Sequence, residues 1–132
     1  MRLERLRSFV APVSIAFAAA CVTRPPEPVF PVRASASVSD TYGCAIRAVN
    51  DVQYSVMTAD RASGVFVAQR AQRGGVYVDR LSVNVYPDTA GHTELRVVAD
   101  SRDGEEIFPP SPEGRTARNE VIRSCGEPLS DK

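Results

Sequence analysis

Few side chains of this sequence could do chemistry, and their spacing brings none of them into a recognisable catalytic set. His92 is the one histidine among the 132 residues, and it stands in a predicted turn between two strand-like segments. A catalytic or metal-binding histidine needs neighbours that orient it or share its metal, whereas a lone histidine in a turn is usually solvated. We therefore expect no catalytic role for His92 and no zinc site of the cysteine–histidine type.

The acidic cluster at residues 100–106 is spaced wrongly for calcium. It reads Asp-Ser-Arg-Asp-Gly-Glu-Glu, but a calcium loop of the helix–loop–helix type carries oxygen ligands at alternate positions before its glycine. The Gly74-Gly75 pair lacks the lysine and hydroxyl residues of a phosphate-binding loop, and it predicts a tight hairpin turn instead. We expect no catalytic residue, no metal and no cofactor, and hence a protein that is not an enzyme.

The remaining candidates for chemistry are three cysteines, Cys21, Cys44 and Cys125. An odd number in an exported protein leaves one thiol to be explained. If Cys21 is modified, Cys44 and Cys125 are left to form one disulfide bond in an oxidising compartment. Catalytic redox cysteines usually stand close together in sequence. Because these two stand far apart, we expect a structural disulfide.

The first 20 residues have the pattern of a secretory signal. Three arginines before residue 8 are followed by an uncharged, largely apolar run over residues 8–20, which is the basic and short apolar pattern of such leaders. A membrane-spanning helix takes about 20 apolar residues, and this run is shorter and contains Pro12. We expect residues 1–20 to be a signal peptide rather than a transmembrane anchor.

The leader ends in Ala18-Ala19-Ala20-Cys21, which resembles the lipobox of bacterial lipoproteins, although that family prefers leucine where Ala18 stands. The resemblance implies cleavage before Cys21 and a lipid anchor, palmitate included, on that cysteine. Because Ala18 and Ala20 also fit an ordinary signal peptidase site, an unmodified Cys21 at the mature N-terminus is the alternative. Val22 is not the aspartate associated with inner-membrane retention, so the resemblance implies the periplasmic face of the outer membrane, in a host that has one.

Residues 21–39 are predicted to be a tether between the lipidated cysteine and the folded domain. The segment is rich in proline at its start, with Pro25, Pro26, Pro28 and Pro31. Proline denies helix and favours extended polyproline conformation, which would hold the domain away from the lipid. The alternative is that residues 29–32 dock on the edge of the domain as an irregular strand.

A folded domain is predicted over residues 40–126. Apolar residues at helical spacing follow a possible cap at Ser39 or Asp40 and predict a helix to about residue 51. Strand-like runs follow at residues 53–59, 65–72, 76–86 and 93–101, separated by turn residues. After a predicted loop at residues 102–110, Ser111-Pro112 has the cap-and-proline signature of a second helix that ends near Cys125. Residues 127–132 are predicted to be a flexible tail.

This order predicts an α+β fold, a two-layer sandwich built from a helix, a meander of three or four antiparallel strands and a second helix. If the two helices pack side by side, Cys44 near the start of the first and Cys125 at the end of the second are natural partners. The segment from Ala59 to Ala68 is similar to the strand–turn–strand of small bacterial envelope lipoproteins of uncharacterised function. Domains of this kind also recur in accessory lipoproteins of outer-membrane machinery, and the resemblance implies no reaction.

Charge composition argues against a nucleic-acid partner. The formal net charge is zero, with 16 basic and 16 acidic residues, so nothing attracts a phosphate backbone. We expect a non-catalytic interaction or scaffold role, in which the tethered domain contacts another envelope protein or a cell-wall component through its sheet face or an edge. The alternative is a small-ligand-binding module with an aromatic-lined sheet face, drawn from Tyr54, Phe66, Tyr77, Tyr86 and Phe108.

Overall fold

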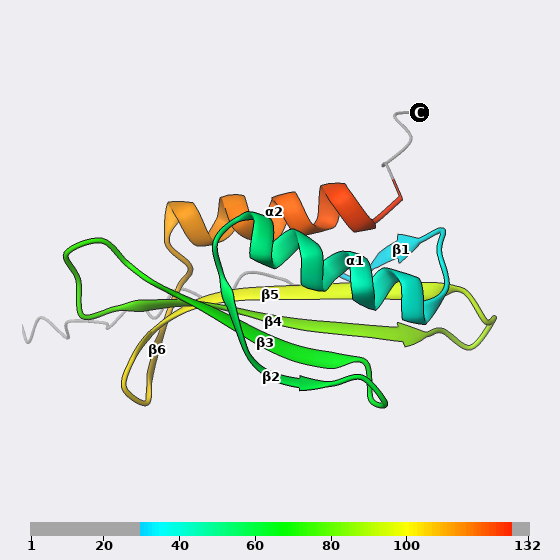
Figure 1. The fold of residues 1–132 in the computed structure, drawn as a ribbon, viewed down its shortest axis with the longest axis horizontal. Helices are drawn as coiled ribbons and strands as arrows, with labels where there is room; N and C mark the ends of the chain where they lie inside the picture. The colour runs from blue at the N-terminus through cyan, green and yellow to red at the C-terminus, as the bar shows by residue number, and fades with distance from the viewer. Residues whose placement is uncertain (1–29, 128–132) are drawn as a thin grey trace, which may run out of the picture.

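A computed structural model describes residues 30–127 of the chain. The predicted signal peptide, the lipobox-like motif with Cys21 and most of the predicted tether lie outside the described residues. The elements are, in order, β1 (Val32–Ala34), α1 (Val38–Asp51), β2 (Ser55–Asp60), β3 (Val65–Ala71), β4 (Val78–Pro87), β5 (Thr93–Asp103), β6 (Glu106–Phe108) and α2 (Pro112–Cys125). Two helices pack on one antiparallel sheet (Figure 1). The predicted α+β two-layer sandwich is confirmed.

The sheet is an antiparallel meander with two short additions. β2, β3, β4 and β5 are neighbours in chain order, and β1 and β6 both pair with the outer edge of β5. β1 lies opposite Thr93–Leu95 at the start of β5, whereas β6 lies opposite Ser101–Asp103 at its end. The four strand-like runs predicted from the sequence are therefore the meander. β6 falls in the segment predicted as a loop, because three residues after a tight turn carry too little alternation to reveal a strand.

The predicted tether is wrong in its C-terminal part, since the domain begins at Val32 rather than at residue 40. Pro31 is the last proline of the segment, and the residues after it have the backbone amides that a strand pair requires. Docking on the domain edge, the alternative to a tether, is what the structure has from Val32 onward. The backbone N–H of Glu127 donates to Arg33 O at 2.8 Å, so the first residue of the predicted tail is also bound to β1.

Hydroxyl caps fix where both helices begin. Ser111 is the predicted cap of α2, and its Oγ accepts from Gly114 N at 3.0 Å. Pro112 follows at a position whose N–H would have no helical partner in any case. α1 begins earlier than predicted, because Ser37 rather than Ser39 or Asp40 is the cap, and its Oγ accepts from Asp40 N at 3.1 Å. A capping serine satisfies one of the free N–H groups of the first turn.

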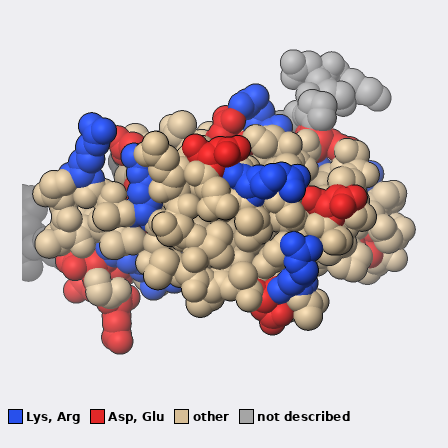
Figure 2. All heavy atoms as spheres, in the orientation of Figure 1, with Lys and Arg blue, Asp and Glu red and all other residues tan. Residues whose placement is uncertain are grey.

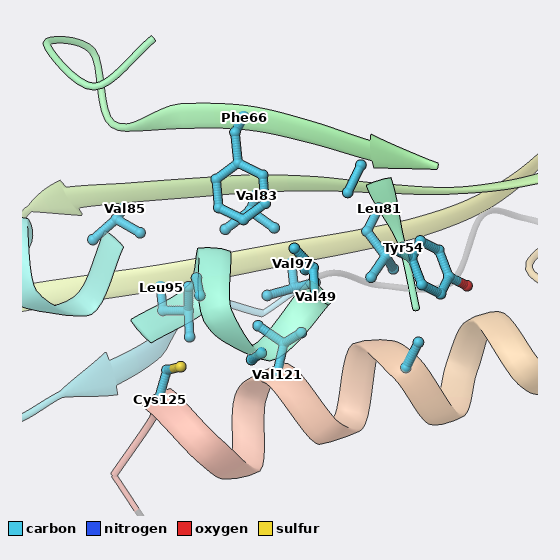
Figure 3. Close-up of a cluster of buried hydrophobic side chains, with 14 of the residues drawn as sticks. Val49, Tyr54, Phe66, Leu81, Val83, Val85, Leu95, Val97, Val121 and Cys125 are labelled. Carbon is cyan, nitrogen blue, oxygen red and sulfur yellow. The ribbon is translucent and has the colours of Figure 1, made fainter. Parts of the chain in front are cut away.

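Alternate residues of the long strands form a core against both helices. In β4 and β5 the inward residues include Leu81, Val83 and Leu95, all essentially inaccessible to solvent. Val49 of α1 and Val121 of α2 pack onto them (Figure 3). Full burial of each such side chain stabilises the fold by roughly 1.5–3 kcal/mol. The opposite face of the sheet carries the outward residues of the same strands.

The two helices lie side by side and are cross-linked. Cys44 of α1 and Cys125 at the end of α2 form a disulfide with their Cα atoms 5.8 Å apart and a sequence separation of 81. This is the pair expected from the sequence. The bond closes nearly the whole described domain into one covalent loop.

Candidate functional site

The structure brings neither of the two features first considered for chemistry into a catalytic or metal-binding group within the described residues. His92 lies in the β4–β5 turn, where Asp88 Oδ1 accepts from the backbone amides of Ala90 and His92. The imidazole is half exposed and lies 3.5 Å from the Asp88 carboxylate. The acidic cluster spans the end of β5 and the turn to β6. No group of three or more histidine, cysteine, aspartate or glutamate side chains within residues 30–127 is placed to hold a metal ion.

The aromatic residues of the alternative hypothesis lie in three separate places. Tyr54 and Phe66 are buried in the core. Tyr77 and Phe108 meet edge to face at the end of the sheet, with ring centroids 5.3 Å apart. Tyr86 is on β4 with its side chain on the face opposite the helices. The structure therefore does not bring the five rings into one pocket.

The sheet face opposite the helices, called here the open face, carries an ordered polar ladder on β4 and β5. Arg80 and Asp100 are cross-strand partners and form an ion pair at 3.0 Å, and Arg102 lies 3.1 Å from the same carboxylate. Further along, Tyr86 Oη donates to Glu94 at 3.3 Å. Neither helix covers this face. These side chains are half buried by one another, which gives the open face a defined polar surface.

On the helix-facing side, the inward residues change from apolar to polar near the end where α2 begins. Asp79 is two residues before Leu81 in β4 and has the same inward orientation. Its cross-strand neighbours are Arg70 of β3 and Ser101 of β5. Asp79 is only 3% exposed. A carboxylate buried to this extent must be compensated by hydrogen bonds or charges.

Three donors converge on one oxygen of Asp79. Its Oδ1 accepts from Gln72 Nε2 at 2.8 Å, from Ser101 Oγ at 3.1 Å and from Ser111 Oγ at 2.8 Å. Ser111 is also the N-cap of α2, so the carboxylate lies beside the first turn of that helix, where the helix dipole favours negative charge. The network joins β3, β4, β5 and α2. Asp79 of β4 is thus held in one position by donors from the residue just after β3, from β5 and from the N-cap of α2.

Tyr54 brings a second buried polar group to this end of the core. The residue is 3% exposed, and its hydroxyl has no hydrogen-bond partner among the described residues. The hydroxyl points away from the apolar cluster (Figure 3). Burial, the largest cause, together with the charge of Asp79 raises the pKa of Tyr54 to about 12, against the opposing effect of Arg70. The hydroxyl is therefore protonated at neutral pH and can donate.

A hollow of about 310 Å³ opens next to these groups and is lined by Arg70, Ala71, Gln72, Arg73, Asp79 and Glu113. A second, more open hollow adjoins it, with Arg70 and Glu113 contributing to both. The walls carry two guanidinium groups and two carboxylates. We refer to the first hollow as the Asp79 hollow. It presents charge of both signs and a preorganised carboxylate, which suits binding.

Sequence reasoning missed Asp79. Its signal was present, because Asp79 is the charged residue within the inward series that continues with Leu81, Val83 and Val85. An acidic residue in the apolar phase of a strand is either at the end of the buried region or in a polar site. Only the position of α2 distinguishes the end of the buried region from a polar site, and the sequence of the strand does not give that position.

Charges of both signs are interspersed over the face seen in Figure 2, with no single-sign patch. Over residues 30–127, no helix combines the length and apolarity needed to cross a bilayer. Comparison with known proteins adds no family: the chain matches no protein-family model and no curated protein sequence.

Proposed function

We propose that this chain is a lipid-anchored envelope protein, attached through Cys21 and facing the periplasm from the outer membrane, whose domain acts by non-catalytic binding. Three observations support the anchor. They are the signal-like leader, the lipobox-like motif at its end, and the Cys44–Cys125 bond, which leaves Cys21 as the odd cysteine. Lipid on Cys21 would account for a thiol that is otherwise without a role in an oxidising compartment.

The observation that supports a binding role is that the helices cover one face of the sheet and leave the other uncovered. Both helices pack on one face, while the open face presents the polar ladder of β4 and β5 over strands of ten and eleven residues. Arginine and tyrosine are enriched at protein interfaces, and the ladder contains Arg80, Tyr86, Arg96 and Arg102. Its side chains are held by cross-strand contacts, so little conformational entropy is lost on docking. A partner with polar groups and charges of both signs fits this surface.

Site-specific crosslinking in the cell envelope tests the role of the open face. A photo-crosslinking amino acid is placed at Ser82 or at Asn84, both at the middle of the open face, in the full chain. The matched control is Asn50, which is exposed on α1. We expect one reproducible crosslinked species from Ser82 and Asn84 and none from Asn50. No species from the open face, or the same species from all three positions, would count against docking through this face.

A further inference from the structure

The Asp79 hollow has an acceptor that the protein itself does not use. All three donors to Asp79 end on Oδ1. Within the described part of the chain, Oδ2 accepts no hydrogen bond, although Asp79 forms part of the wall of the hollow. A structural role in capping α2 accounts for Oδ1. It does not account for Oδ2, which is not among the fully buried side-chain atoms that lack a hydrogen-bond partner and is therefore open to a donor in the hollow.

The charged groups around the hollow are held apart rather than paired. Arg70 and Asp79 are direct cross-strand partners, yet no ion pair joins them. Among the described residues, the Arg70 guanidinium has one hydrogen bond, to Val52 O at 3.4 Å. Arg73 and Glu113, on the exposed rim, also form no ion pair with the residues that the structure describes. Elsewhere in the same sheet, Arg80 and Asp100 do close to 3.0 Å.

The signs of these groups are separated by element. The guanidinium groups come from β3 and the turn that follows it, as Arg70 and Arg73. The carboxylates come from β4 and the first turn of α2, as Asp79 and Glu113. A purely anionic ligand would be repelled by the Asp79 carboxylate, and a purely cationic ligand would be repelled by the Arg70 guanidinium. A ligand that carries both charges satisfies both sides at once.

We propose that the Asp79 hollow binds a small zwitterion of the amino-acid type, with an ammonium group and a carboxylate a few bonds apart. The ammonium group donates to Asp79 Oδ2 and Glu113, and the carboxylate accepts from Arg70, whose planar guanidinium suits bidentate pairing. The Tyr54 hydroxyl, which has no hydrogen-bond partner among the described residues, is close enough to Asp79, Arg70 and Glu113 for their charges to act on its pKa. A hollow of about 310 Å³ is at the small end of ligand sites and accommodates an amino acid or a dipeptide. The site is on the helix-facing side of the sheet, so it does not depend on docking through the open face.

Titration of the isotope-labelled mature protein with alanine and with alanyl-alanine, followed by amide NMR, tests the proposal. We expect shifts that saturate at Gln72, Asp79 and Gly114. N-acetylalanine and alaninamide each lack one charge and should bind at least tenfold more weakly, since each loses one side of the site. Equal binding of either analogue overturns the zwitterion. So does a larger response to a neutral sugar such as glucose, or the absence of saturable shifts at the hollow.

Variants on the rim separate binding from folding. Asp79→Asn would also disturb the cap of α2, so Glu113→Gln and Arg70→Met are the informative substitutions. Each should weaken alanine binding about tenfold with the thermal midpoint nearly unchanged. The control is Glu120→Gln, which changes a carboxylate of the same helix that is paired with Arg123, and it should leave binding unchanged. Unaltered binding in both Glu113→Gln and Arg70→Met overturns the assigned contacts.

Discussion

At the scale of single residues, Asp79 and Tyr54 show two outcomes of burying a polar group. Both are 3% exposed. Asp79 receives three hydrogen bonds on one oxygen, which compensates for the water it has lost. The hydroxyl of Tyr54 has no partner among residues 30–127, so its neutral form alone is tolerated. The consequence is a stability that depends on pH in the alkaline range.

Tyr54→Phe should remove that dependence. The folded chain holds the pKa of Tyr54 at about 12, against 10.0 as the ordinary value. The unfolded chain therefore releases the proton first, and stability present below pH 10 is lost as pH rises toward 12. The full decrease in the free energy of unfolding is about 2–3 kcal/mol. Urea unfolding between pH 7 and 11.5 should show this decline for the unsubstituted chain, a flatter profile for Tyr54→Phe, and little difference between the two at pH 7.

A matched substitution, Tyr86→Phe, removes a hydroxyl from the open face and should keep the alkaline decline. If Tyr54→Phe instead costs more than about 1 kcal/mol at pH 7, the hydroxyl of Tyr54 has a hydrogen-bond partner, because loss of a partnered group has a cost of that order. That result would point to a group from outside the described residues.

At the scale of elements, close turns set the register of the meander. The turn between β2 and β3 ends at Gly64, which has a left-handed φ of +73°. Gly64 O accepts from Val85 N at 2.8 Å, so this turn also touches β4. A Cβ on Gly64 would lie 2.0 Å from Val85 O, closer than any side chain can be. Glycine is therefore required here by both conformation and space.

Gly64→Ala should be much more destabilising than Gly91→Ala. Gly91 also has a left-handed φ, +82°, but nothing lies within 4 Å of a Cβ built on it. Gly91→Ala should cost about 1–2 kcal/mol, the expense of the left-handed backbone alone. Gly64→Ala adds a clash with backbone and should cost at least about 2 kcal/mol more. Chemical denaturation measures both, and equal losses would show that β2 and β3 shift away from β4 easily.

At the scale of the whole molecule, the two ends of the described domain meet. β1 brings the chain in at one end of β5, and Glu127, just after α2, is hydrogen-bonded to Arg33 of β1. The Cys44–Cys125 bond is next to this point in the chain. Under the proposed anchor on Cys21, tension from the membrane would enter through β1. It would meet a strand fastened both to β5 and to the cross-linked end of α2.

Intact mass and unfolding before and after reduction test this arrangement on protein purified from its own membranes. We expect a chain that begins at Cys21 with a diacylglyceryl addition and gains two hydrogens on reduction. Opening a loop of 81 residues should lower the free energy of unfolding by about 4 kcal/mol. The Cys44→Ala/Cys125→Ala variant should be insensitive to reductant. A water-soluble form that begins at Cys21 without lipid would contradict the anchor.

The strong local patterns of the sequence were sufficient for the main elements. Strand-favouring side chains between turn residues identified β2 and β3, alternation identified β4 and β5, and Ser111-Pro112 identified the start of α2. These signals are properties of a few neighbouring residues. The fold class followed from their order, and the cysteine positions suggested the pair that the structure joins. Predicted boundaries shifted where local signals compete, as at the cap of α1, where Ser37, Ser39 and Asp40 are all acceptable caps.

Only the tertiary structure decided the rest. β1 and β6 are three-residue strands that form because each end of β5 has an edge available for pairing. A segment of three residues carries too little pattern to predict that it will pair with a distant strand. The candidate site has the same origin. Arg70, Asp79 and Ser101 become neighbours through strand register, and Glu113 joins them through the placement of α2. Such contacts between distant segments are fixed by packing of the whole sheet and helix layer, which no single segment encodes.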